Sequence, residues 1–447
     1  MARLWDKGEA TKEQVMEFTV GIDPILDLSL LPWDCVGSAA HARMLQKINL
    51  ISATELNEAL TGLREIYQQS VAGTFVIPPE LEDCHTAIEN RLTENHGELG
   101  EKIHTGRSRN DQVLLATRLF LRSELVMMLQ EIGGVAESLH ALYTRSGSLP
   151  MPGYTHLQPG MPSSVGLWIH AFFEQSLELI RDGLSLLTAI NANPLGAGSG
   201  FDTPLPLDRA YVAKLLGFER VQRSVVDCQN SRGRYERKVL FFGTEVATLV
   251  EKLAWDLSLY CTREFGFVRL PKALTTGSSI MPQKRNPDVV ELLRARSGTV
   301  RGCLQELDWV AGKLPSNYHR DLQLTKEPLL RGVRCTHEML KILPLVLDGL
   351  EFDQAALERA MWPELYATYE VYAAVRGGET FRSAYKAAGA RAARGEYQVD
   401  AVRGDFKEIA ARAEHGMAEA SHELALLLPM IGTAKVQYCD LSSILGG

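Results

Sequence analysis

The chain has 447 residues, of which 45% are hydrophobic and 23% are charged, a composition typical of an ordinary globular protein and not of a disordered or collagen-like chain. Its 47 basic and 55 acidic residues give a formal net charge of −8, so it lacks the overall positive charge that attracts the phosphate backbone of nucleic acids. The seven cysteines include no pair within four residues of each other, which predicts neither a zinc site nor a disulfide framework.

The N-terminal stretch predicts no export signal. It carries Arg3, Asp6 and Lys7 where a signal peptide requires an apolar run. The longest uncharged stretch, residues 146–173, is long enough to span a membrane but contains four prolines, which would break a spanning helix. We therefore expect a soluble, cytoplasmic protein that binds neither membranes nor nucleic acid.

Helical periodicity dominates the chain, and strand patterns are scarce. Residues 1–105 predict short helices, interrupted by breaks such as Gly37 and Gly73. From Asp111 to about Tyr143, apolar residues recur at intervals of three, four and six. This pattern predicts a helix far longer than the average of about 11–12 residues.

Four more long helices are expected downstream, over about 163–193, 231–265, from 286 onward, and 322–350. The first of these has Ser163 or Ser164 as its cap, and the third opens on the capping residue Asn286, followed by Pro287. Short helices are expected after residue 352. Together, five long helices joined by loops predict an all-α fold with a central bundle. The expected parts are an N-terminal helical domain (1–105), a central long-helix bundle (106–351) and a small C-terminal helical domain (352–447).

The long helices carry more apolar surface than one bundle needs. Residues 119–121, Leu-Phe-Leu, and 239–242, Val-Leu-Phe-Phe, place large apolar side chains on more than one helix face. Such wide stripes predict burial between subunits. The alternative is a crowded core within a monomer.

Three segments gather polar, charged and glycine residues between the apolar helices. Residues 104–112 place two arginines at a helix start, which favours an anion site; the alternative is an elaborate helix cap. Residues 153–158 contain His156, a residue type that, taken alone, is more often structural than catalytic. Residues 275–287 hold Gly277, two serines and a lysine before a helix start, which favours a lid that closes over a carboxylate; the alternative is a solvated connector.

The third segment carries a resemblance to a known family. Residues 277–287, Gly-Ser-Ser-Ile-Met-Pro-Gln-Lys-Arg-Asn-Pro, match the pattern Gly-Ser-Ser-x-Met-Pro-x-Lys-x-Asn-Pro of the fumarase/aspartase superfamily. Residues 104–112, His-Thr-Gly-Arg-Ser-Arg-Asn-Asp-Gln, resemble the argininosuccinate lyase family more than fumarases, aspartases or adenylosuccinate lyases. Residues 83–86, 194–198 and 314–327 agree as well, so the likeness covers nearly the whole chain.

This resemblance implies a β-elimination in which argininosuccinate splits reversibly into arginine and fumarate, without a metal or an organic cofactor. It also implies a homotetramer that packs twenty long helices into a core, with each active site built from three segments of three different subunits. Two alternatives stay open. One is a lyase that releases fumarate from another N-substituted aspartate such as adenylosuccinate, and the other is a catalytically silent structural relative.

The elimination requires a base for a weakly acidic C–H group, donors for the charge that builds on the neighbouring carboxylate, and a proton for the leaving nitrogen. The family pattern makes Ser278 the base, activated by Lys284, Asn286 and loop N–H groups when the lid closes. His156 matches the family's active-site histidine and Glu291 the carboxylate paired with it, while the group that protonates the leaving nitrogen stays open. The residues expected to hold the substrate are Ser108, Arg109, Asn110, Thr155, Asn286, Tyr318, Gln323, Lys326 and Asp27.

The chain departs from the family pattern at positions tied to substrate recognition. Asp23 stands where the family commonly has a serine, and Gly233 replaces a substrate-contacting arginine, although Arg232 and Arg234 flank it. Met161 lies in a segment, 158–162, that also differs from the usual pattern. These changes leave the predicted elimination machinery intact. They indicate a divergent branch of the same enzyme family, with a relative acting on another N-substituted aspartate as the alternative.

Overall fold

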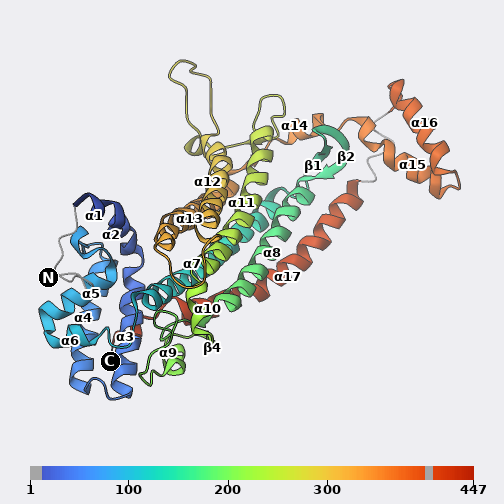
Figure 1. The fold of residues 1–447 in the computed structure, drawn as a ribbon. Coiled ribbons are helices and arrows are strands. Elements are labelled where there is room, and N and C mark those ends of the chain that lie inside the picture. Colours follow the sequence, from blue (N-terminus) through green and yellow to red (C-terminus); the bar gives the residue numbers. More distant parts are fainter. Residues whose placement is uncertain (1–12, 398–405, 447) are drawn as a thin grey trace.

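The computed structural model describes residues 13–397 and 406–446, so the charged N-terminal stretch lies outside it. Among the described residues, six long helices form the body of the molecule. They are α7 (Arg109–Ser146), α8 (Val165–Ile190), α11 (Arg234–Tyr260), α12 (Asp288–Ala311), α13 (Lys326–Gly349) and α17 (Phe406–Tyr438). In Figure 1 they run side by side, with the short helices α1 to α6 gathered at one end and α15 and α16 at the other.

Shorter helices surround this body. Those at the first end are α1 (Glu13–Val20), α2 (Asp23–Leu26), α3 (Leu31–Lys47), α4 (Ala53–Val71), α5 (Cys84–His96) and α6 (Glu98–Lys102). The others are α9 (Arg209–Leu215), α10 (Val225–Asn230), α14 (Gln354–Arg359), α15 (Ala367–Arg376) and α16 (Phe381–Ala393). A 3-10 helix, Arg320–Thr325, leads directly into α13. The all-α prediction is therefore confirmed.

The expectation of only short helices after residue 352 is wrong, because α17 has 33 residues. This helix packs against α7 and α8, and its buried residues Met417 and Leu424 belong to the apolar core of the long helices. The residues that follow it return to α1–α6, where Ile444 and Leu445 join a second apolar core. The division into three domains stays a prediction, with α17 lying along the central bundle.

The strands within residues 13–397 and 406–446 form three two-stranded sheets. The longest pair is the antiparallel hairpin of β1 (Pro150–Thr155) and β2 (Gln158–Ser164), with Pro150 opposite Ser164 and Thr155 opposite Gln158. Each of the other two sheets pairs strands of two residues: β3 (Ala192–Asn193) with β4 (Arg220–Val221), and β5 (Val268–Arg269) with β6 (Glu351–Phe352).

Local chemistry explains where the long helices begin. Ser108 caps α7 in a capping box with Asp111. Ser164, one of the two predicted candidates, caps α8 by accepting a hydrogen bond from the Leu167 N–H. The predicted cap at Asn286 is wrong. Helix α12 begins at Asp288 without a side-chain cap, because the Asn286 side chain instead donates to the Gly277 carbonyl at 3.4 Å.

Two fully buried arginines fix α7 against the end of α8. Arg118 donates to the carbonyls of Ile190 (3.2 Å) and Ala192 (2.9 Å), and its guanidinium lies 3.6 Å from the centre of the Tyr235 ring. Arg122 donates to Asn191 Oδ1 at 3.0 Å. A cation at a helix C-terminus satisfies carbonyls that have no partner within the helix, so these bonds stabilise the α7–α8 pair.

A buried ion pair between α7 and α13 predicts pH-dependent stability. His337 Nδ1 lies 2.6 Å from Glu131 and its Nε2 lies 2.9 Å from Glu124, with Lys341 3.6 Å from Glu131. Burial lowers the pKa of His337, but the two carboxylates outweigh burial and raise it to about 9. A raised histidine pKa stabilises the fold fully below the unfolded pKa of about 6.5, and this contribution, at most about 3 kcal/mol, is lost as the pH rises towards 9.

The urea concentration at the midpoint of unfolding should therefore decrease in the wild type as the pH is raised from 7 to 9. A His337→Gln variant should show a flatter dependence, and equal slopes in the two proteins would contradict the assignment.

Candidate active site

The start of α7 presents the predicted anion site. Arg109 Nη2 lies 2.9 Å from Asp83 Oδ2 and donates to Thr86 Oγ1 at 2.5 Å, while its Nη1 lies 3.5 Å from Glu82. These partners hold the guanidinium beside the first turn of the helix, where unpaired N–H groups also favour an anion. Asn110 lies in the same turn, half-buried.

Ser108 and Asp111 shape this turn from within. The Ser108 hydroxyl accepts the Asn110 N–H at 3.2 Å, so it serves as a helix cap, and a contact with substrate stays a prediction. The Asp111 carboxylate accepts the N–H groups of Ser108, Gly196 and Gly198 at 2.9–3.0 Å. Burial raises the pKa of Asp111 to about 6 in spite of these hydrogen bonds. Asp111 therefore ties the segment 194–198 to the anion site, a link that no local sequence pattern reveals.

Lys326, at the start of α13, lies between two buried carboxylates. Its Nζ donates to Asp23 at 2.9 Å and to Asp27 at 2.6 Å, and all three residues are at most 9% exposed. Burial lowers the pKa of Lys326, but the charges of Asp27 and Asp23 raise it overall. Asp23, which departs from the family's serine, is therefore a partner of Lys326.

Asp27 also connects this cluster to α5. Its Oδ2 accepts the Cys84 N–H at 3.1 Å. Asp27, Cys84 and His85 are the group of buried potential metal ligands found in the described part of the chain, with ligand atoms within 4.8 Å of one another. The ammonium of Lys326 lies 2.6 Å from Asp27 and opposes the binding of a second cation there.

The segment before α13 contacts the end of α1. Gln323 Nε2 donates to the Thr19 carbonyl at 3.0 Å, and Arg320 donates to the same carbonyl at 2.7 Å. Tyr318 is half-buried close to a cavity of about 220 Å³ whose lining includes Arg232 and Leu322.

The geometry of Gly233 accounts for the missing arginine. Its φ of +82° is rarely adopted by other residues, and a Cβ atom there would lie 2.7 Å from the Cβ of Ala311. The neighbouring Arg232 is buried, and its Nε lies 3.7 Å from Glu236. Arg232 therefore supplies positive charge close to this position without occupying it.

The signature segment forms a protruding loop before α12. Its ends are joined by backbone hydrogen bonds between Thr276 and Asn286 at 2.9 and 3.1 Å. Within it, Ser278 Oγ accepts the N–H groups of Ile280 (3.3 Å) and Met281 (3.1 Å). Two N–H donors would stabilise the negative charge that a serine base carries after losing its own proton.

The other predicted catalytic residues near this loop face solvent. Lys284 is exposed, and Glu291 is exposed in the first turn of α12, 3.9 Å from Arg294. Ile280, at the far side of the loop, is 82% exposed.

His156 lies at the tip of the β1–β2 hairpin. His156 and Leu157 form its two-residue turn, with φ of 55° and 57°, which is the left-handed geometry that such a turn requires. Non-glycine residues in this conformation store strain, a feature that concentrates at functional sites. The sequence predicts no hairpin here because its prolines argue against strands. An isolated hairpin accepts proline since both of its strands are edges. Thr155, at the end of β1, is exposed beside His156.

Helix lengths separate these segments within one chain. Arg109 opens α7 and the hairpin follows its C-terminus, so the 38 residues of α7 place them about 55 Å apart at about 1.5 Å per residue. Likewise, the signature loop precedes α12 and residues 318–326 follow it, which puts about 35 Å between them. Figure 1 shows β1 and β2 at the end of the body away from α5. One chain therefore brings Arg109, Asp27 and Lys326 together but holds Ser278 and His156 elsewhere.

Comparison with known proteins decides the family. A family model described as "Lyase" matches residues 8–302. The argininosuccinate lyase of Sorangium cellulosum is 44% identical over 384 residues, which cover 86% of this chain and 89% of that protein. The chain belongs to the argininosuccinate lyase family.

Solved structures support the fold of this family member. A crystal structure of EDDS lyase in complex with formate aligns with a TM-score of 0.81 at 20% identity, covering 98% of this chain and 95% of that one. Recombinant class II fumarase from Schistosoma mansoni aligns with a TM-score of 0.74 at 16% identity, over 96% and 95% of the two chains. The predicted superfamily fold is therefore confirmed. The family match and the argininosuccinate lyase relatives confirm the assignment to the carbon–nitrogen lyases. Within the described residues, no helix is both long and apolar enough to cross a membrane.

Proposed function

We propose that this argininosuccinate lyase family member catalyses the reversible elimination of fumarate from argininosuccinate, releasing arginine, in the cytoplasm. Membership of the family and the hydrogen-bonded Ser278 in the signature loop carry this proposal. Ser278 would remove the proton from the carbon beside a carboxylate, with its charge stabilised by the N–H groups of Ile280 and Met281. Lys284 and Asn286 would bind the carboxylate that takes up charge.

The remaining predicted residues would bind and orient the substrate. Arg109, Asn110 and Thr155 would hold its carboxylates, with Ser108 shaping the helix start. Tyr318, Gln323, Lys326 and Asp27 would contact the amino-acid end, and His156 with Glu291 would support proton movement. Holding the reacting groups in one geometry is itself a large part of such a rate enhancement.

We propose further that four copies assemble and share their active sites. The separations of about 55 Å and 35 Å along α7 and α12 mean that one chain cannot supply all the segments at one point. The apolar side chains left on the long helices support burial between copies: Phe241 is 57% exposed, Trp309 is 77% exposed and Leu345 is 56% exposed.

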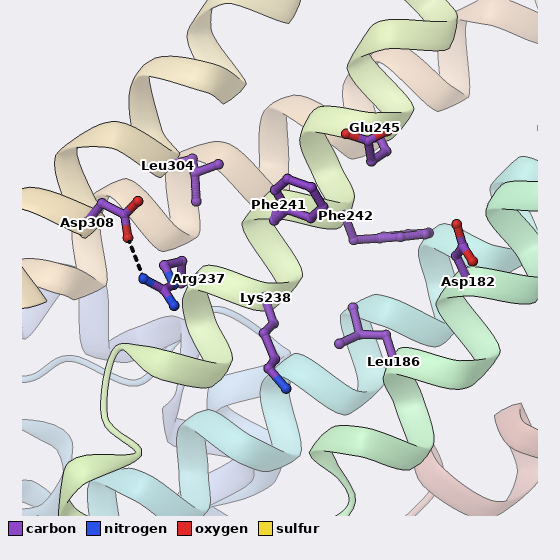
Figure 2. A pocket seen from close by; sticks show the side chains of 9 residues that line it. All are labelled: Asp182, Leu186, Arg237, Lys238, Phe241, Phe242, Glu245, Leu304 and Asp308. Atoms are coloured by element: carbon purple, nitrogen blue, oxygen red, sulfur yellow. Dashed lines mark hydrogen bonds and ion pairs between the residues drawn. The ribbon is translucent and has the colours of Figure 1, made fainter. Parts of the chain in front are cut away.

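A hollow on the bundle face supports the same proposal. Figure 2 shows Phe241 and Phe242 of α11, Leu186 of α8 and Leu304 of α12 around this space, with the Arg237–Asp308 pair at its edge. The hollow has a volume of about 610 Å³. An apolar floor with a charged edge is the usual anatomy of a protein–protein interface, so a second copy would cover it.

The reaction is tested by mixing the purified protein with argininosuccinate and, separately, with adenylosuccinate, while the ultraviolet absorbance of fumarate is followed. We expect fumarate from argininosuccinate and none from adenylosuccinate. Fumarate from adenylosuccinate alone would instead identify a different substrate. If neither compound releases fumarate, the result supports the alternative that the protein is a catalytically silent relative.

The sharing of sites is tested by combining two inactive variants. His156→Asn and Ser278→Ala chains, unfolded together in equal amounts and refolded, should regain about one quarter of wild-type activity, because random assembly gives half of the sites an intact hairpin and half of those an intact loop. Each variant refolded alone is the control. An active monomer in a sizing experiment, or a mixed assembly without regained activity, would refute the proposal.

A further inference from the structure

Helix α3 carries a buried carboxylate, Asp34, close to the start of α7. Across the residues that the structure describes, no hydrogen bond or ion pair joins it to Arg109 or to another residue assigned to the substrate. Asp34, in α3, is 2% exposed. Its Oδ2 lies 2.7 Å from His85 Nδ1, and its Oδ1 accepts a hydrogen bond from Gln112 Nε2 at 2.9 Å. His85 and Gln112 are both nearly fully buried. A carboxylate with this burial is retained only when its partners are fixed in place.

These two partners belong to the first turns of two different helices. His85 is the second residue of α5, and Gln112 is the fourth of α7. The same first turn of α5 supplies Thr86, and its cap supplies Asp83; these are the residues that hold the Arg109 guanidinium at 2.5 and 2.9 Å. Asp34 therefore joins the turn that carries Arg109 to the turn that orients it.

Most of the charged groups that face Asp34 and His85 favour an ion pair here, and His104 interacts with both residues. Burial raises the pKa of Asp34, but the charge and hydrogen bond of His85 outweigh burial and lower it overall. Burial lowers the pKa of His85, but Asp34, with smaller contributions from Asp83 and Asp27, raises it overall. Arg107 also acts on Asp34, and it donates to Ser38 Oγ at 2.9 Å one turn along α3.

We propose that Asp34 is a positioning residue for substrate binding: through His85 and Gln112 it sets the register of α5 against α7 and so fixes Arg109 and Asn110 toward the substrate carboxylate. This role rests on the proposed function of Arg109 and goes beyond it, because the buried Asp34 is not one of the residues assigned to the substrate. Partners that orient binding groups from behind commonly affect affinity more than the chemical step.

The test compares Asp34→Asn with the wild type in the assembled, full-length protein. The asparagine keeps the shape but removes the charge that protonates His85. KM for argininosuccinate should rise about tenfold or more while kcat changes less than about threefold.

Two further variants make the result specific. His85→Gln should also raise KM, and the double variant should be no worse than Asp34→Asn alone, since Asp34→Asn already removes the link through His85. If Asp34→Asn does not fold, the KM of His85→Gln tests the positioning role in its place. His337→Gln is the matched control, because it removes another buried histidine–carboxylate pair, far from Arg109, and should leave KM unchanged.

The outcomes separate this inference from the proposed function. An unchanged KM in Asp34→Asn, or a fall in kcat alone, would overturn the positioning role. If the wild type releases no fumarate from argininosuccinate, the proposed function fails instead. In that case calorimetry with succinate as the probe still tests the inference: weaker binding to Asp34→Asn than to His337→Gln supports it, and equal binding overturns it.

Discussion

Replacing Ser278 with alanine should lower kcat by about a thousandfold or more while the protein remains folded and assembled, because the change removes the proposed base from a loop that carries no core packing. Ser278 Oγ accepts two backbone N–H groups, so the same donors that close the loop would stabilise the hydroxyl after it loses its proton. The measurement is steady-state fumarate release, with circular dichroism and sizing to verify the fold.

The neighbouring serine offers a matched control. Ser279 is exposed one position further along the same loop, and Ser279→Ala should keep activity within a few-fold of wild type. If Ser278→Ala retained near-normal turnover, another group would have to be the base. Equal losses in both variants would instead point to the shape of the loop.

Replacing Lys326 with methionine should destabilise the protein by about 3–5 kcal/mol and abolish activity, because it leaves Asp23 and Asp27 buried without their cation. Asp27 determines how the free energy of unfolding depends on pH in the acid range. Burial raises the pKa of Asp27, but Lys326 lowers it overall, so Asp27 stabilises the fold above its unfolded pKa and this contribution is lost as the pH falls through its folded pKa. Urea unfolding of the variant should therefore lose part of this acid dependence.

Asp23→Ser gives the contrasting case. Burial raises the pKa of Asp23 in spite of Lys326, so the folded state disfavours the charged form of this carboxylate. Its removal leaves the Lys326–Asp27 ion pair in place. We expect a change in unfolding free energy of less than about 1 kcal/mol. A loss as large as that of Lys326→Met would show that both carboxylates are needed to hold the ammonium.

The sequence predicts those features that depend on local patterns. Apolar spacing predicts five of the six long helices of the described residues but misses α17, and Ser164 predicts the start of α8, because periodicity and capping act within a few residues. The capping preference of Asn286 misleads, since its side chain bonds back across the signature loop. Prolines hide the β1–β2 hairpin for a comparable reason: the rule against proline applies to paired strand positions, and this hairpin has two free edges.

The sequence predicts the residues of the candidate site better than it predicts the contacts between them. The resemblance to the family motifs leads to Ser278, His156 and Arg109 as candidates, yet nothing in the sequence pairs Lys326 with Asp23, which lies 303 positions away. The link from Asp34 to His85 and Gln112 is equally invisible, because each residue is ordinary in its own segment. Contacts between buried polar side chains on different helices arise only when the helices pack, and no periodic pattern records them.

Helix α7 has Arg109 as its first residue, and the β1–β2 hairpin follows its last residue. The number of residues in α7 therefore fixes both the distance and the rotation between these two segments. Each residue of an α-helix adds about 1.5 Å and turns the chain by about 100°. One extra residue in the middle of α7 would thus rotate one end against the other by more than a quarter turn. Every helix contact beyond the insertion would lose its partner, and the proposed shared sites would be misaligned, although no residue with a proposed role in the chemistry had changed. The length of this helix is therefore as strict a requirement for the enzyme as the identity of any side chain in its loops.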